Sequence, residues 1–230
     1  MGLLAVMFKT DYHYAILSSS RRYMVDKVVL NIQEQIYRGI SVLKTGGLVA
    51  FPTDTVYGLG ASSGIPRAVR LIYKAKERSP SLALPLLIAE PSQIGEVASY
   101  VSPLAWRLVR EFLPGALTIV LPSLKSVSSI ITGGGKTVAV RIPAHPVAIA
   151  LIKGVGMPIV GTSANLSGQP SALTADEVHS QFGDKLDLVI DSGRCRARES
   201  TIVDVTGEVP KLLREGAISK AELSKVCEII

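Results

Sequence analysis

Cysteine and histidine are scarce in this 230-residue sequence, which excludes two common ways of building a stable core or a site. The two cysteines, Cys195 and Cys227, are too few for a disulfide framework, and no cysteine or histidine pair has zinc-site spacing. The three histidines, His13, His145 and His179, are far apart in the sequence, so we expect no metal site made by the protein alone. Such cysteine usage is typical of a reducing compartment, and we expect a cytoplasmic protein.

Long apolar runs are also missing. Near the N-terminus, Lys9 and Asp11 interrupt the apolar residues well before the roughly 20 that a membrane span needs. We therefore expect no association with a membrane. We interpret residues 1–26 as an N-terminal appendage that need not be ordered. A targeting peptide is the alternative, because Arg21 and Arg22 follow three serines.

Aromatic residues are few, at 5% of the chain, whereas hydrophobic residues of all kinds make up 47%. This composition is ordinary for a folded protein with an aliphatic core, and it excludes a disordered chain. The 25 Lys and Arg residues exceed the 19 Asp and Glu residues, which gives a formal net charge of +6. The excess favours anionic partners, either phosphate ligands or nucleic acid, although an ordinary basic surface explains it equally well.

Helix-like and strand-like segments alternate along the chain, which is typical of an α/β domain. Short turns between some neighbouring strands indicate a mixed sheet rather than a purely parallel one. No repeat or long linker divides the chain, so we expect a single domain over residues 27–230. The expected helices lie near 27–44, 66–76, 91–100, 103–112 and 146–153 and begin near 174 and 219, and the expected strands lie near 48–51, 82–88, 116–121, 137–142, 158–161, 187–190, 200–205 and 210–213.

Two glycine-rich segments invite a nucleotide-binding interpretation, and both fail on detail. GGGKT (133–137) resembles the end of a phosphate-binding P-loop, but Ile130 stands where that motif needs glycine. A strand pattern also follows it where the motif needs a helix. GLGASSG (58–64) misses the dinucleotide-binding pattern by one position, so we interpret it as a tight turn. The sequence contains no Ser-His-Asp order, HExxH motif or catalytic-cysteine context that would support another chemistry.

Three other segments carry polar groups suited to ligand binding. PTDTVYGLG (52–60) follows an expected strand, where α/β sheets place ligands, although a turn with capping hydrogen bonds is an equal alternative. Lys74, Lys76 and Arg78 gather at the end of an expected helix, where cations either bind an anion or only stabilise the helix end. GTSANLSGQPS (161–171) follows another strand and offers many small donors, either to a ligand or as turn formers.

An ordered series of segments resembles the YrdC/TsaC-like threonylcarbamoyl-AMP synthase family over about residues 30–215. None of the motifs is specific alone, but their order and spacing together are. They are GGLVAFPTDTVYGLG (46–60), KER (76–78), PGALTIVLP (114–122), TVAVRIPAHP (137–146), TSANLSG (162–168), ESTIVD (199–204) and LLREG (212–216).

The resemblance implies a short, single-domain enzyme of the α/β class, with a twisted mixed β-sheet flanked by helices around a large basic cleft. It implies that L-threonine, bicarbonate or carbon dioxide, and ATP are joined into threonylcarbamoyl-AMP, with release of pyrophosphate. Mg²⁺ is expected with ATP, because it neutralises phosphate oxygens and aligns an in-line attack. The product would pass to a threonylcarbamoyl transferase partner that modifies adenosine beside the anticodon of certain tRNAs.

The resemblance also assigns roles to individual residues. Thr55, Arg141 and Ser200 match positions that bind threonine. Positions that bind ATP are matched by Lys76, Arg78, Thr137, Ser163, Asn165, Ser171 and Arg214, and Lys76 and Arg78 are the expected catalytic pair. Cations beside the phosphates suit this chemistry, because the leaving pyrophosphate develops negative charge.

One departure and two alternatives accompany the resemblance. Many members carry Asn-Pro-Leu and a nearby histidine after the KxR motif, whereas this chain has SPSLALPLLI (79–88), with Leu82 at the asparagine position. The first alternative is a non-catalytic protein that binds double-stranded RNA or tRNA, although no aromatic RNA-binding motif is present. The second is the related carbamoyl-phosphate branch that matures hydrogenases, whose acylphosphatase and zinc-finger segments are not found in this sequence.

Overall fold

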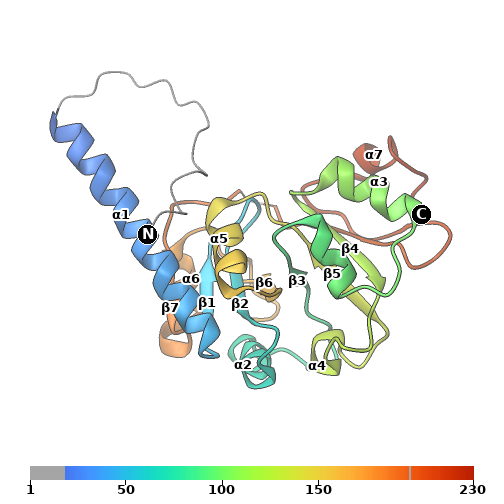
Figure 1. Cartoon of the computed structure of the whole chain (residues 1–230), viewed down its shortest axis with the longest axis horizontal. Coiled ribbons are helices and arrows are strands. Elements are labelled where there is room, and N and C mark those ends of the chain that lie inside the picture. The colour runs from blue at the N-terminus through green and yellow to red at the C-terminus, as the bar shows by residue number, and fades with distance from the viewer. Residues whose placement is uncertain (1–18, 197) are drawn as a thin grey trace, which may run out of the picture.

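The structure is a computed structural model that describes residues 19–196 and 198–230, with side chains from residue 31 onward (Figure 1). Its helices are α1 (Ser19–Lys44), α2 (Pro66–Lys76), α3 (Pro103–Phe112), α4 (Ser129–Thr132), α5 (Pro146–Val155), α6 (Ala175–Phe182) and α7 (Lys220–Leu223), with the 3₁₀ helices η1 (Pro91–Glu96) and η2 (Gly183–Lys185). Its strands are β1 (Val49–Phe51), β2 (Gly58–Ser62), β3 (Leu86–Leu87), β4 (Leu117–Pro122), β5 (Thr137–Arg141), β6 (Ile159–Ser163), β7 (Leu188–Val189), β8 (Thr201–Asp204) and β9 (Lys211–Arg214).

The strands of the described chain form one sheet in the order β7-β1-β2-β6-β3-β5-β4-β8-β9. Three neighbouring pairs run parallel, namely β1 with β7, β3 with β5, and β4 with β8. The other neighbours run antiparallel. Helices flank this sheet, so the prediction of an α/β fold with a mixed sheet is confirmed.

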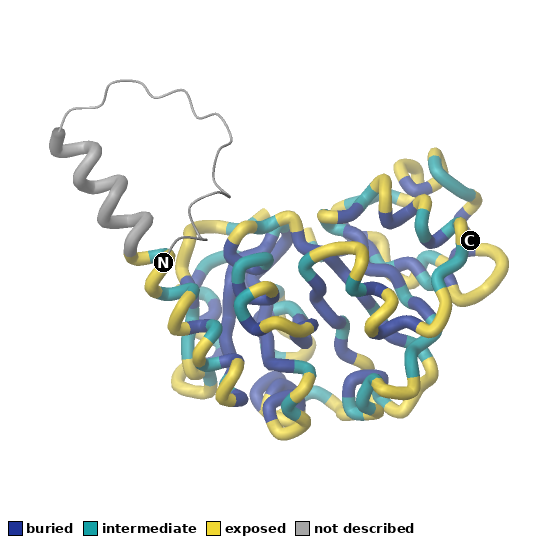
Figure 2. The backbone as a smooth tube through the Cα atoms, in the orientation of Figure 1, coloured by how far each residue is buried: buried dark blue, intermediate teal, exposed yellow. Residues whose placement is uncertain are grey.

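Two hydrophobic clusters hold the helices on the sheet. The larger one, which we call the main core, packs Ile72 of α2 and Leu108 of α3 with strand residues such as Ile119. The second cluster packs α5 and the end of α1 against β1 through residues such as Leu151 and Phe51. Figure 2 shows the inner strands buried, while the exposed positions lie on loops and on outer helix faces. Each fully buried aliphatic or aromatic side chain of this kind contributes roughly 1.5–3 kcal/mol through the hydrophobic effect.

The interpretation of residues 58–64 as a tight turn is wrong, because residues 58–62 form the inner strand β2. Its glycines mark close packing rather than a turn. A Cβ atom at Gly60 would lie 2.7 Å from the ring of Phe51. Glycine in a strand often marks such a close approach, which the sequence pattern alone does not distinguish from a turn.

Several other boundaries differ from those expected. The strand near 82–88 is reduced to β3, residues 86–87, and the helix expected near 91–100 is the shorter 3₁₀ helix η1. The first helix begins at Ser19, so the expected boundary after residue 26 falls inside α1. Residues 1–18 of the predicted appendage lie outside the described residues. Among the residues that the structure describes, none of the helices has the length and hydropathy to cross a membrane.

Candidate active site

A cavity of about 290 Å³ lies on the sheet face that points away from the main core. Neighbouring residues of a strand point to opposite faces of its sheet. In β4, Ile119 therefore packs in the main core, whereas Thr118 and Val120 line the cavity. In β5, Val140 packs in the core and Arg141 lines the cavity. The sheet thus provides the floor of the cavity.

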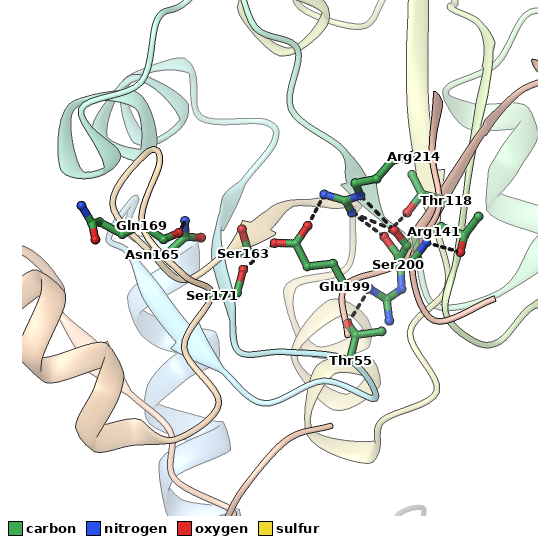
Figure 3. A network of polar contacts seen from close by, with 12 residues as sticks. Thr55, Thr118, Arg141, Ser163, Asn165, Gln169, Ser171, Glu199, Ser200 and Arg214 are labelled. Carbon is green, nitrogen blue, oxygen red and sulfur yellow. Dashed lines mark hydrogen bonds and ion pairs between the residues drawn. The ribbon is translucent and has the colours of Figure 1, made fainter. Parts of the chain in front are cut away.

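Segments that are distant in the sequence form the walls of this cavity (Figure 3). They are the loop between β1 and β2, Arg78 just after α2, the end of β6, the segment that leads into β8, and the end of β9. In Figure 3, Ser163 and Ser171 lie on one side and Arg141, Ser200 and Arg214 on the other. The predicted site residues that line the cavity are Thr55, Arg78, Arg141, Ser163, Ser200 and Arg214.

Arg141 is almost completely buried at the floor, with 7% of the residue exposed. Its Nη2 donates to Asp54 Oδ1 at 2.7 Å, its Nη1 to Thr55 Oγ1 at 2.9 Å and its Nε to the Gly115 carbonyl at 3.0 Å. Burial lowers the pKa of Arg141, and the Asp54 carboxylate raises it in part. A guanidinium has five N–H groups, so one N–H on each terminal nitrogen is left for a ligand. Such a fork suits a carboxylate.

Thr55 presents an acceptor rather than a donor to the cavity. Thr53 Oγ1 donates its proton to the Val56 carbonyl at 2.6 Å. The 2.9 Å contact between the Thr53 and Thr55 hydroxyls must then use the Thr55 proton. Because Thr55 Oγ1 also accepts from Arg141, one lone pair remains. That lone pair suits a ligand that brings its own N–H or O–H group.

Arg214 and Ser200 form a second fixed group, on the same side of the cavity as Arg141 (Figure 3). Arg214 donates from Nε and Nη2 to the Ser200 carbonyl at 3.1 and 2.8 Å, and Nη2 also contacts Ser200 Oγ at 3.2 Å. The Ser200 hydroxyl lies 2.9 Å from that of Thr118 on the floor. Arg214 Nη1 forms an ion pair with Glu199. These contacts fix the plane of the guanidinium against the cavity.

Arg78 reaches the cavity because α2 ends abruptly before it. Glu77 adopts a left-handed conformation with φ of 53°, and the backbone N–H of Arg78 then bonds to the Tyr73 carbonyl. Its Nη2 donates to the Ala83 carbonyl at 3.1 Å, while the buried Nε has no hydrogen-bond partner among the described residues. Burial lowers the pKa of Arg78. A half-buried guanidinium with spare donors is suited to an anion.

Lys76 does not line the cavity, in contrast to the expectation that it lies beside phosphates. The residue is 2% exposed, and its Nζ donates to the Ser163 and Asn165 carbonyls at 2.5 and 2.6 Å. The side-chain oxygen of Asn165 lies 3.4 Å from the same ammonium. Burial lowers the pKa of Lys76 to about 8, so the ammonium form still predominates at neutral pH. The three N–H groups are thus used to hold the loop after β6.

The remaining predicted nucleotide contacts lie beside the cavity rather than in its lining. Asn165 donates to the Leu166 and Gln169 carbonyls and so stabilises its own loop. Ser171 donates to Glu199 Oε1 at 2.5 Å. Thr137 shares a face of β5 with Arg141 but lies four residues away, beyond the cavity.

The segment that departs from the family pattern leaves its apolar side chain outside the cavity. Leu82 is 50% exposed, and its carbonyl accepts from the Tyr73 hydroxyl at 2.9 Å. Ala83 and Pro85 line the cavity instead. Neither supplies a polar side chain at this wall.

Sequence reasoning did not single out Asp54, Thr118 or Glu199 as site residues. Asp54 lies in the PTDT loop and Glu199 begins ESTIVD, so their motifs were identified without their individual contacts. Thr118 had a local signal, because it is a polar residue within the apolar strand ALTIVL. Among the described residues no group of three or more His, Cys, Asp or Glu side chains is arranged to hold a metal ion.

The chain is similar to known proteins over most of its length. A family model for Sua5, YciO and YrdC proteins, described as telomere recombination, matches residues 41–216. Over 86% of its length, the chain is 41% identical to a threonylcarbamoyl-AMP synthase of Pyrococcus abyssi, of which it spans 60%. A threonylcarbamoyl-AMP synthase of Idiomarina loihiensis is 40% identical over 70% of the chain, and the match covers 87% of that relative.

The fold of a solved relative matches as well. The crystal structure of Pyrococcus abyssi Sua5 complexed with L-threonine has a TM-score of 0.82 and 42% sequence identity with the chain. The match covers 85% of the chain and 58% of that protein.

Proposed function

Because the chain belongs to the Sua5/YciO/YrdC family, we propose that it is an L-threonylcarbamoyladenylate synthase, a nucleotidyltransferase. One observation carries the proposal. Arg78, Arg141 and Arg214, which are distant in sequence, all line a single cavity. The substrates would be L-threonine, bicarbonate or carbon dioxide, and ATP, and the products threonylcarbamoyl-AMP and pyrophosphate.

We propose that threonine binds at the Arg141 end of the cavity. The two free N–H groups of Arg141 would hold the amino-acid carboxylate, and the free lone pair of Thr55 would accept from the amine or hydroxyl of threonine. The Ser200 hydroxyl lies close enough to the floor to contact the same ligand. The crystal structure of a relative with L-threonine supports the ligand class.

The nucleotide would lie in the part of the cavity lined by Ser163, Arg78 and Arg214. The threonine amine first captures carbon dioxide to give a carbamate. A carbamate oxygen then attacks the α-phosphorus of ATP, and the bond to the leaving pyrophosphate breaks. Fixed cations stabilise the charge that develops on the pyrophosphate, so Arg78 and Arg214 would supply positioning and charge neutralisation.

We propose that Mg²⁺ enters as part of the substrate MgATP. Glu199 is the carboxylate among the lining residues, and both its oxygens are engaged by Ser171 and Arg214. Magnesium usually keeps several waters and binds substrate phosphates through few protein groups. Its chemistry here would be neutralisation of phosphate oxygens.

Lys76 has a different proposed role from the one expected. Its ammonium would support the loop that carries Ser163 and Asn165, and so act on the nucleotide indirectly. Thr137 would contact the nucleotide only if a ligand extends along β5 beyond the cavity.

The product would be handed to a threonylcarbamoyl transferase in the cytoplasm for modification of tRNA. Non-catalytic binding of double-stranded RNA or tRNA does not require a buried Arg141 held by Asp54 and Thr55, so the cavity favours catalysis over that alternative.

The test is pyrophosphate release and mass-spectrometric detection of threonylcarbamoyl-AMP with MgATP, bicarbonate and L-threonine. We expect product only when all three are present. Equal pyrophosphate release without L-threonine, or none with every substrate present, would overturn the proposal. A salt-sensitive RNA affinity together with inert ATP chemistry would favour the RNA-binding alternative.

A further inference from the structure

Glu199 lines the cavity and joins the segment after β6 to the end of β9 (Figure 3). Its Oε1 accepts from the Ser171 hydroxyl at 2.5 Å, and its Oε2 pairs with Arg214 Nη1. Ser171 belongs to the segment after β6, and Arg214 ends β9. The carboxylate therefore joins two residues on which a nucleotide is expected to depend.

The backbone of Glu199 is fixed, so its side chain projects from a defined point. The Glu199 carbonyl accepts from the Ala217 N–H at 2.8 Å. A Cβ atom at Gly216 would overlap that carbonyl, which shows how closely the two segments approach. The Glu199 side chain is still 35% exposed and lines the cavity. It is accessible to a ligand yet held in place.

Glu199 determines which groups of its two partners remain free. Ser171 donates its only proton to Glu199, so its lone pairs are left for a ligand. Arg214 uses Nε and Nη2 on Ser200 and one N–H of Nη1 on Glu199, so the second N–H of Nη1 is left for a phosphate oxygen. The carboxylate therefore sets the orientation of one acceptor and one charged donor.

We propose that Glu199 is a positioning residue that fixes Ser171 and Arg214 for ATP and thereby sets nucleotide affinity, without a role in threonine binding. This inference rests on the proposed function. The negative charge of Glu199 would repel a triphosphate. Both oxygens of Glu199 are paired, with Ser171 and Arg214, so we expect the gain from a correctly oriented Arg214 to exceed this repulsion. If Glu199 instead only competes with the phosphates for Arg214, its neutralisation would strengthen ATP binding.

The Glu199→Gln substitution tests these opposite expectations. Glutamine keeps the shape and an acceptor for Ser171, but presents no charge to Arg214. By calorimetric titration, we expect the Kd of MgATP to rise roughly tenfold, the usual effect of one hydrogen bond to a charged group. The Kd of L-threonine should change by less than about twofold. Glu208→Gln, an exposed glutamate on the turn before β9, is the matched control for the change in net charge.

A second variant keeps the test decisive if Glu199→Gln folds poorly. Ser171→Ala removes the other end of the bridge, and it should weaken ATP while leaving threonine binding intact. In the double variant the two losses should be less than additive, because both act through one contact.

Unchanged or tighter ATP binding by Glu199→Gln would overturn the inference, as would equal weakening of both ligands, which would indicate a merely structural role. A wild-type protein that binds ATP but forms no product would overturn the proposed function. The role of Glu199 would then still be decided by the Kd values of MgATP and L-threonine. A wild-type protein that binds no ATP would overturn both.

Discussion

Arg141 carries a charge where little water reaches it. Three oxygen acceptors surround it, namely the Gly115 carbonyl, the Thr55 hydroxyl and the Asp54 carboxylate. Removing one partner of a buried ion pair leaves the other charge uncompensated. The arginine can therefore not be studied by simple deletion without risk to the fold. A lysine retains the charge near Asp54 but loses the planar fork.

For Arg141→Lys we expect the KM for L-threonine to rise at least roughly tenfold, because a bidentate contact with the carboxylate is lost. The KM for ATP should change by less than about threefold. Initial rates of pyrophosphate release at varied threonine and at varied ATP measure both values. An unchanged threonine dependence would contradict the placement of the amino acid.

We expect Arg78 to contribute to charge neutralisation more than to stability, since among the described residues its side chain makes one hydrogen bond, to the Ala83 carbonyl. For Arg78→Ala we expect kcat to fall roughly 10²–10³-fold, as for removal of other fixed groups that stabilise transition-state charge. The Tm should fall by no more than about 3 °C. A variant that unfolds but keeps normal specific activity in its soluble fraction would argue against the assignment.

Lys76 makes a prediction about pH. Its pKa is lowered from 10.5 to about 8 in the folded protein, so between these values the unfolded chain binds more protons. The free energy of unfolding therefore rises with pH across that interval. Below about pH 8, burial of the charged Lys76 ammonium destabilises the folded protein to its full extent. In urea unfolding at pH 7 to 10, the stability of the wild type relative to Lys76→Met should increase by up to about 3 kcal/mol. A constant difference would show that the burial of Lys76 does not shift its pKa.

At the scale of elements, the approach of β8 to the turn after β9 positions Glu199 and Ser200. Thr201, which is completely buried, holds that turn. Its hydroxyl donates to the Ile218 carbonyl at 2.5 Å and accepts from the N–H groups of Gly216 and Ile218. The ESTIVD and LLREG motifs thus contact each other and form one local structure. This pairing explains why a glycine follows Arg214 and Glu215.

For Gly216→Ala we expect a loss of roughly 2 kcal/mol or more of unfolding free energy, because a Cβ would lie 2.6 Å from the Ser200 carbonyl carbon. ATP and threonine affinities should both weaken, since Glu199 and Ser200 move together. Gly95→Ala is the control, because a Cβ there meets nothing within 4 Å. If both variants unfold at the same urea concentration, the close approach does not constrain this segment.

Elements with strong periodic patterns were predictable from the sequence, whereas those defined by tertiary packing were not. The helices α2, α3 and α5 lie close to their expected ranges. Strand β2 was missed because its glycines serve the approach of Phe51, a long-range contact. Strand β3 has two residues, too few for a period to be recognised.

At the scale of the molecule, the mixed sheet brings together segments from residue 53 to residue 214 on one face. The resemblance to the family indicated motifs whose residues line the cavity, whereas the polar segments alone left a turn or a helix end as an equal alternative. The sequence did not predict that the Lys76 ammonium is used to hold a loop, since that depends on where the Ser163 and Asn165 carbonyls lie. Nor did it predict that Glu199 joins Ser171 and Arg214. Both are long-range contacts between segments that the sequence treats as separate.

The most direct test of this arrangement is a crystal structure of the protein with MgATP and L-threonine. We expect triphosphate oxygens within hydrogen-bonding distance of Arg78 and Arg214, and the threonine carboxylate on Arg141. Ligands bound away from this cavity, or a triphosphate that contacts none of the three guanidinium groups, would contradict it.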